Sequence, residues 1–190
     1  MMTKSEQLLL ARTARSLAPG SHIVEVGSWL MGSARIMSQA NPQAEILCVD
    51  PFSGPVTERE SLEFLADYPE FQGLRTPELA QAIVKDLDNI TILAAVSPHN
   101  LGSHPEQFDL YFEDGNHRDP LLKANLDYWL ARLKPGGILA LHDNDIPDVN
   151  NHIQQLLAEG YTILDQCDSL TVLIKPPCGS EAAAKFSDQI

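Results

Sequence analysis

The sequence predicts an α/β fold in which a mostly parallel sheet of seven strands is covered by helices on both faces. Short β-rich runs alternate with stretches of helical periodicity, which is typical of parallel strands joined by crossover helices. The last two β-rich runs are separated by only a short turn and therefore predict an antiparallel hairpin. A chain of 190 residues suits one such three-layer domain, which we place at 1–176, followed by a tail at 177–190.

The first half of the chain begins with a helix and a βαβ unit. Apolar residues at helical spacing predict a helix over 3–17. The runs HIVEV at 22–26 and EILCVD at 45–50 are predicted strands, and a helix at about 33–41 joins them. A segment at 51–77, rich in Pro, Gly, Glu and aromatic residues, follows the second strand and can form a lid over a ligand. The alternative is that its aromatic side chains pack into the core.

Strands and helices continue to alternate in the second half. The predicted strands are ITILAA at 90–95, FDLYFED at 108–114 and, after the turn KPGG, ILALHD at 138–143. The predicted helices lie at 77–88, after the strand at 108–114 and up to about Leu133, and at 149–159. YTILDQ and SLTVLIK form the closing hairpin, with its turn at Asp168 and Ser169.

Composition and charge restrict the class of partner. The chain has 26 acidic and 13 basic side chains, and its net charge of −13 repels nucleic acid and anionic membranes. No apolar stretch approaches the roughly 20 residues that span a bilayer, and the N-terminus does not resemble a secretory signal. Cys48, Cys167 and Cys178 are odd in number and lack CxxC spacing, which argues against a disulfide framework or a thiolate zinc site. We expect a cytoplasmic protein with a small-molecule substrate, whose tail is either loose or docked in a homo-oligomer.

The stretch VEVGSWLMGSA joins the first strand to the next helix. Gly27 allows a sharp turn and the close approach of a ligand, and the free N–H groups after Gly32 can donate to a carboxylate. Glu25 can face a cationic group, and Asp50 at the end of the second strand can accept hydrogen bonds from a ribose diol. An adenosine ligand with an amino-acid tail satisfies these groups. The alternatives are a tight turn without a ligand or a dinucleotide site, and the missing GxGxxG spacing disfavours the latter.

A second group of polar residues lies in YFEDGNH and LHDND. Asp114 ends one predicted strand, and His142 and Asp143 end the next, so neighbouring strands would bring them together. A divalent cation relieves the repulsion between paired carboxylates. Consecutive strand residues point to opposite faces, so His142 and Asp143 can both bind the cation only where the strand bends; Asp143 with Asp145 is the alternative pair. His117 has the ordinary pKa of a general base at neutral pH.

Together, VEVGSWLMGSA, CVDPF and FEDGNHRDPLLKANLDYWLARLKPGGILALHD resemble class I S-adenosylmethionine-dependent methyltransferases, and especially the branch of macrocin-type and cephamycin-type O-methyltransferases. The resemblance covers about residues 20–175. It implies a Rossmann-like fold and an enzyme that methylates a hydroxyl group of a small molecule. The cofactor it implies is S-adenosylmethionine, with Mg²⁺ or another divalent metal as an assisting ion.

The resemblance also implies roles for individual residues. Those that would hold the methionine and ribose parts of the cofactor are Glu25, Gly27, Ser28, Ser33 and Asp50, with Val96 and Ser97 against the adenine. Asp114, His142 and Asp143 match the metal ligands, and His117 matches the general base that acts beside Asp114.

Two positions depart from the family pattern. Met31 stands where a glycine is common, which affects the backbone path around the methionine part of the cofactor. His142 stands where several magnesium-using relatives have an acid, so a softer metal, or none, is an alternative. Two other functions stay open: a cofactor-binding or assembly subunit without activity, and a nicotinamide-dependent oxidoreductase, which the absent GxGxxG disfavours.

Overall fold

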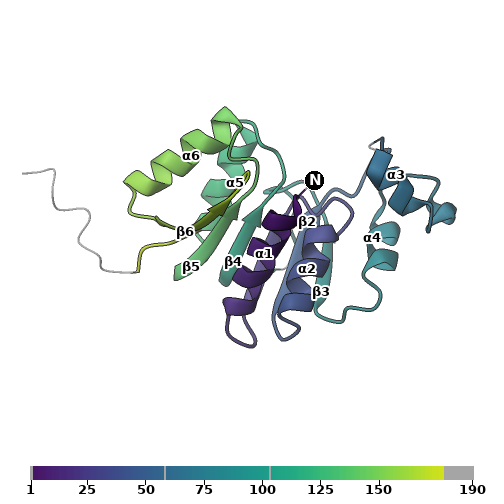
Figure 1. Ribbon diagram of the computed structural model, residues 1–190, viewed down its shortest axis with the longest axis horizontal. Helices are drawn as coiled ribbons and strands as arrows, with labels where there is room; N and C mark the ends of the chain where they lie inside the picture. The colour runs from purple at the N-terminus through teal and green to yellow at the C-terminus, as the bar shows by residue number, and fades with distance from the viewer. Residues whose placement is uncertain (1, 58, 103, 178–190) are drawn as a thin grey trace, which may run out of the picture.

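The structure is a computed structural model, and it describes residues 2–57, 59–102 and 104–177. Seven strands form one sheet in the order β3-β2-β1-β4-β5-β7-β6 (Figure 1). They are β1 (His22–Val26), β2 (Glu45–Asp50), β3 (Ile90–Ala94), β4 (Phe108–Glu113), β5 (Leu133–Leu141), β6 (Thr162–Cys167) and β7 (Leu170–Ile174). The first five strands are parallel, and β7 pairs antiparallel with both β5 and β6. The predicted fold class is therefore confirmed.

Helices cover both faces of this sheet. They are α1 (Lys4–Ser16), α2 (Gly32–Ala40), α3 (Arg59–Leu65), α4 (Pro77–Ile83), α5 (Leu121–Leu130) and α6 (Pro147–Ala158), with a short 3-10 helix at Pro69–Phe71. Figure 1 shows α1 and α2 side by side on one face, α5 and α6 over the β4–β5 side, and α3 and α4 beyond the β3 edge. None of the helices in the described ranges is long and apolar enough to cross a membrane.

The alternation of side chains along the strands divides the core into two halves. In β1, Ile23 packs with the α1 and α2 side chains, whereas Val24 and Val26 pack with those of α5 and α6. Both halves are almost free of solvent, and each fully buried aliphatic side chain contributes about 1.5–3 kcal/mol. A shift of one residue would turn each strand inside out, so this pattern fixes the register. The register places the carboxyl ends of β1, β2, β4 and β5 at one edge.

Three predicted boundaries are wrong. The helix predicted to end at about Leu133 is α5, which ends at Leu130. The motif KPGG does not precede β5 but lies within it: β5 begins at Leu133, and its pairing with β4 shifts between Phe108 and Leu110. Gly136 has a left-handed φ of +74° and donates its N–H to the Lys175 carbonyl oxygen, so the expected turn is an irregularity inside the sheet. α4 ends at Ile83, and residues 84–86 and 88–89 form turns instead of a longer helix.

The segment at 51–77 contains α3 and the 3-10 helix. Phe52 is buried, Tyr68 and Phe71 pack partly against the core, and Phe64 is 41% exposed. Most of its aromatic residues therefore serve the core, as the alternative expected, and a lid function stays a prediction. Cys48 and Cys167 are free thiols, and Cys178 lies outside the described residues.

Candidate functional site

Two polar loops meet at the carboxyl edge of the sheet, and Gly27 is the point of contact. Gly27 has a φ of +92°, and a Cβ there would lie 2.2 Å from the Asp114 carbonyl oxygen. The Asp114 N–H donates to the Val26 carbonyl oxygen at 2.9 Å. The close approach at Gly27 is thus made by the backbone after β4, which accounts for this glycine without the predicted ligand. Any side chain at this position would push the two loops apart.

Glu25 is the centre of a buried hydrogen-bond network. Its carboxylate is 0% exposed and accepts hydrogen bonds from Ser28 Oγ at 2.7 Å, from Ser33 Oγ, and from Cys48 Sγ at 3.4 Å. Burial raises the pKa of Glu25 above its ordinary value even though these donors lower it. The structure therefore brings together three of the predicted cofactor residues. It also shows that Glu25 already has protein partners.

Asp50 lies at the end of β2 and is also surrounded by donors. It accepts hydrogen bonds from the Trp29 N–H at 3.1 Å and the Phe52 N–H at 2.7 Å, and Arg75 Nη1 lies 3.2 Å from Oδ1. The Arg75 guanidinium also lies 4.0 Å from the centre of the Trp29 ring, a cation–π contact. The oxygens predicted for a ribose diol thus face a cation from the 51–77 segment. No spacing in the sequence connects Arg75 with Asp50, and this contact was not predicted.

The predicted adenine residues follow β3. Val96 is 51% exposed and can contact a ligand, whereas Ser97 is buried and accepts a hydrogen bond from Trp129 Nε1 at 2.8 Å. The Ala95 N–H donates to the Asp50 carbonyl oxygen, which places this segment beside β2. Of the two residues, Val96 is the one whose side chain is accessible.

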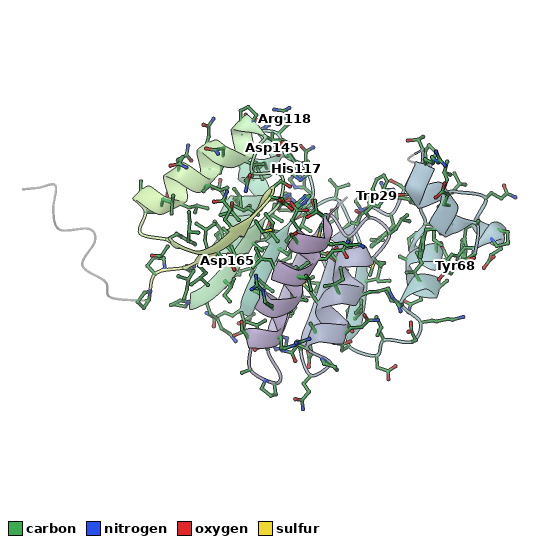
Figure 2. The ribbon with its side chains drawn as sticks, in the orientation of Figure 1. Trp29, Tyr68, His117, Arg118, Asp145 and Asp165 are labelled. Carbon is green, nitrogen blue, oxygen red and sulfur yellow. The ribbon has the colours of Figure 1, made fainter. Side chains whose placement is uncertain are left out.

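The acid–histidine cluster consists of Asp114, His117, His142 and Asp143. Each offers one potential ligand atom, and these atoms lie within 4.8 Å of one another. β5 ends at Leu141, and Asp143 has a left-handed φ of +57°. The chain therefore bends at the point where a bend was needed for His142 and Asp143 to face the same site. Figure 2 shows His117 above the end of the sheet, with Trp29 toward α3. The cluster brings together all the predicted metal and catalytic residues.

The distances within the cluster resemble those between ligands of a shared cation. His142 Nδ1 lies 3.0 Å from Asp114 Oδ1 and 3.2 Å from Asp143 Oδ1, and His117 Nε2 lies 3.5 Å from Asp114 Oδ1. Both of these nitrogen atoms are buried, and neither has a hydrogen-bond partner in the described part of the chain. Ligands about 2.1 Å from a metal lie at most about 4.2 Å apart, so a small contraction would complete a site.

The charges of the cluster are strongly coupled. Burial raises the pKa of Asp114, but His117 and His142 lower it by more, so the pKa lies below its ordinary value. Asp114 raises the pKa of His117. Burial lowers the pKa of His142, but the carboxylates of Asp114, Asp143 and Glu6 overcome this effect and raise it to about 9. The carboxylates of the cluster thus favour the protonated form of both imidazoles.

Glu6 is a residue near the site that was not predicted. Burial raises its pKa, but hydrogen bonds from Ser169 and Thr3 and the charge of His142 lower the pKa to about 2. Thr3 and Glu6 form a capping box at the start of α1. The TxxE spacing was a visible signal for that cap. It gave no indication that Glu6 also reaches His142.

Comparisons with known proteins give a consistent picture. A family model described as a methyltransferase domain matches residues 24–144. The fold is similar to that of precorrin-6y C5,15-methyltransferase from Geobacter metallireducens GS-15, with a TM-score of 0.62 and 16% identity over 92% of this chain and 88% of that chain. It is similar to the O-methyltransferase NovP, with a TM-score of 0.66 and 12% identity over 90% of this chain and 79% of that chain.

A third similar structure is the O-methyltransferase TomG from Streptomyces achromogenes in complex with S-adenosylmethionine. Its TM-score is 0.57, with 16% identity over 93% of this chain and 82% of that chain. A search of curated proteins found no match. At these identities the solved structures show a shared fold, and the reactions in their names belong to those proteins.

Proposed function

The chain belongs to the methyltransferase domain family, and from this premise we propose that it transfers the methyl group of S-adenosylmethionine to a hydroxyl oxygen of a small molecule. The observation that carries this proposal is the contact between Gly27 and the Asp114 backbone. Because the two loops touch, a cofactor held by the first loop would lie beside the acid–histidine cluster. A substrate between them would be close to both.

The first loop offers a complementary surface for the cofactor, which supplies a methyl group on a positively charged sulfur. The N–H groups at the start of α2 carry partial positive charge and suit a carboxylate. Glu25 would accept hydrogen bonds from an ammonium group in place of its serine partners, and Asp50 would accept hydrogen bonds from ribose hydroxyls in place of Arg75. The exposed side chain of Val96 would pack against the adenine.

The cluster offers groups that handle the proton of the acceptor hydroxyl. His117 would accept this proton at a ring nitrogen, with Asp114 and Asp143 on either side to orient the imidazole. Asp114, His142 and Asp143 fit a divalent cation, which would lower the pKa of the hydroxyl when bound. Imidazole among the ligands suits Co²⁺ or Zn²⁺ better than Mg²⁺, which prefers oxygen.

Titration calorimetry with S-adenosylmethionine and S-adenosylhomocysteine, with added metal and after chelation, tests the proposal. We expect micromolar binding of both compounds. The wild-type protein is then assayed for methyl transfer to phenols, sugars and small hydroxy acids, in parallel with Asp114→Asn and His117→Ala. Both variants should bind S-adenosylhomocysteine but lose at least about 100-fold in turnover. Unchanged turnover would refute the two roles. Failure to bind either compound would refute the proposal, and binding without transfer would favour a subunit that lacks activity.

A further inference from the structure

A carboxylate from the N-terminal helix contacts the acid–histidine cluster from the protein interior. Glu6 on α1 is 1% exposed, and its Oε1 accepts hydrogen bonds from the Ser169 N–H at 2.8 Å and the Ser169 Oγ–H at 2.6 Å. Its Oε2 accepts a hydrogen bond from the Thr3 N–H at 2.6 Å and lies 3.4 Å from His142 Nε2, the same distance as Ser169 Oγ, which donates its hydrogen to Glu6. The imidazole of His142 therefore lies between Glu6 on one side and two cluster carboxylates on the other.

We propose that Glu6 is a positioning residue that accepts the Nε2–H of His142 and so directs the Nδ1 lone pair toward a divalent metal ion shared with Asp114 and Asp143. The inference rests on the metal-assisted form of the proposed function. In metal sites, a carboxylate that accepts the second N–H of a ligating histidine fixes its tautomer and orientation and raises its basicity. His142 Nδ1 is buried, close to two carboxylate oxygens and without a hydrogen bond, as this role requires.

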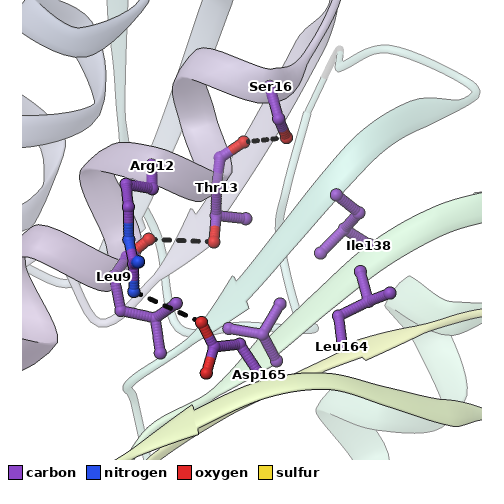
Figure 3. A pocket seen from close by; sticks show the side chains of 8 residues that line it. Leu9, Arg12, Thr13, Ser16, Ile138, Leu164 and Asp165 are labelled. Atoms are coloured by element: carbon purple, nitrogen blue, oxygen red, sulfur yellow. Dashed lines mark hydrogen bonds and ion pairs between the residues drawn. The ribbon is translucent and has the colours of Figure 1, made fainter.

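The position of Glu6 is fixed by tertiary contacts as well as by its own helix. Ser169 lies in the turn between β6 and β7, so its two hydrogen bonds tie the start of α1 to the sheet. Two turns further along α1, Arg12 pairs with Asp165 of β6 at 3.2 Å (Figure 3). Leu9 of α1 and Leu164 of β6 line the groove between the same elements. A capping box requires only the contacts with Thr3, so it does not explain why Glu6 also faces Ser169 and His142.

A pair of variants separates positioning from capping. In Glu6→Gln, the amide oxygen can still accept from Ser169, but the amide NH₂ then faces the N–H groups of Thr3 and His142. In the control, Thr3→Ala, the helix loses the Oγ that accepts the Glu6 N–H at 3.2 Å and donates to Asp168 Oδ2 at 2.6 Å, while the Glu6 carboxylate and its bonds to Ser169 remain. Both variants should lose some thermal stability. Only Glu6→Gln should disturb His142.

The probe is Co²⁺ alone, titrated into each protein by calorimetry and by visible absorption, which responds to the ligands of the ion. We expect the affinity for Co²⁺ to fall 10- to 100-fold in Glu6→Gln, with an altered spectrum. Thr3→Ala should bind within threefold of the wild type with the same spectrum. The inference is overturned if Glu6→Gln binds Co²⁺ like the wild type, if Thr3→Ala loses as much, or if the wild type does not bind Co²⁺.

A titration of the same samples with S-adenosylhomocysteine distinguishes this inference from the proposed function. Binding of S-adenosylhomocysteine without binding of Co²⁺ overturns the role of Glu6 and leaves the methyltransferase proposal in place. Binding of Co²⁺ that depends on Glu6, without binding of S-adenosylhomocysteine, supports the role of Glu6 and overturns the methyltransferase proposal.

Discussion

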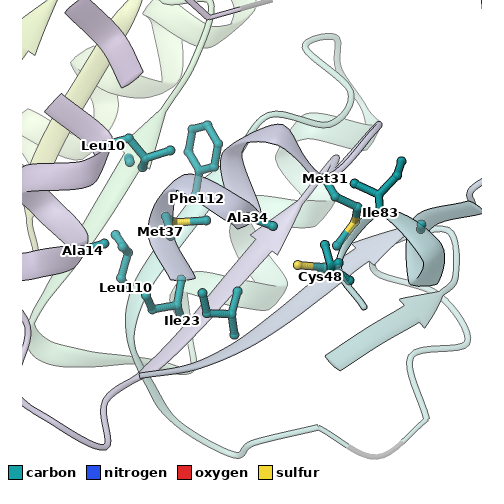
Figure 4. Close-up of a cluster of buried hydrophobic side chains, with 14 of the residues drawn as sticks. Leu10, Ala14, Ile23, Met31, Ala34, Met37, Cys48, Ile83, Leu110 and Phe112 are labelled. Atoms are coloured by element: carbon teal, nitrogen blue, oxygen red, sulfur yellow. The ribbon is translucent and has the colours of Figure 1, made fainter. Parts of the chain in front are cut away.

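Met31 combines a strained backbone with a well-packed side chain, and replacing it should show which effect is larger. Met31 precedes α2 with a φ of +62°, in the left-handed region that favours glycine, and it is 0% exposed. Figure 4 shows it in the core near Cys48 and Ile83. A left-handed conformation costs a residue with a side chain about 1–2 kcal/mol, which Met31→Gly would recover. Truncating a buried methionine to alanine costs about 2–5 kcal/mol, and Met31→Gly removes one more carbon.

Packing should therefore win, with a net loss of about 2 kcal/mol for Met31→Gly. For a chain of this size, that corresponds to a fall in Tm of about 4–8 °C. The matched variant Met31→Ala leaves a similar cavity but keeps a Cβ on the left-handed backbone. It should be about 1 kcal/mol less stable than Met31→Gly. Urea and thermal unfolding of the three proteins measure both differences.

Two results would refute this reasoning. If Met31→Ala is as stable as Met31→Gly, the backbone is not left-handed at this position. If Met31→Gly is more stable than the wild type, the side chain does not contribute to packing as its burial indicates. We also expect Met31→Gly to bind S-adenosylhomocysteine within a few-fold of the wild type, because Met31 already has the backbone conformation that suits a glycine.

Three further substitutions test the predicted cofactor site. Glu25→Gln removes a buried acid whose pKa is raised. The wild type loses stability as the pH rises above about 4.5, because Glu25 then resists ionisation, so the Tm of Glu25→Gln relative to the wild type should increase over the same range, by about 2–4 °C for each kcal/mol. Calorimetry should show at least a tenfold loss of cofactor affinity. Gly27→Ala places a Cβ against the Asp114 carbonyl oxygen and should lower Tm by more than 5 °C. Arg75→Gln frees an oxygen of Asp50 and should tighten S-adenosylhomocysteine binding several-fold; weaker binding would show that Arg75 holds the ligand.

The sheet could be predicted from the sequence because its signals are local. The run HIVEV has the β-rich composition and length of a strand, and β1 covers those residues. The position of the site followed from the sheet, because parallel strands end at a common edge. KPGG was misread for the same reason: a glycine pair signals a turn locally, but the partner that keeps this segment in the sheet is Lys175, far along the chain.

Residues that act through distant contacts could not be predicted. Glu6 and His142 are 136 positions apart, and their contact depends on how α1 packs on the sheet. Arg75 reaches Asp50 through the path of the 51–77 segment, for which neither periodicity nor charge gave a direction. Glu6 was visible as half of a capping box, yet the cap concerns three neighbouring residues and carries no information about the rest of the fold.

His142 and Asp143 were predicted to face one site only if the chain bends after β5. The conformation of Asp143 and the hydrogen bond of the His142 N–H explain that bend. Asp143 takes a left-handed φ, which aspartate tolerates better than most residues with a side chain. The His142 N–H still donates to the Glu113 carbonyl oxygen at 3.2 Å, so the ladder to β4 continues to the residue before the turn. Asp114 directly follows β4, and its backbone packs on Gly27. The loop after β1, Asp114 and the bent end of β5 are thus held in register by one continuous set of backbone contacts, so a shift at Gly27 should displace the acid–histidine cluster as well as the loop.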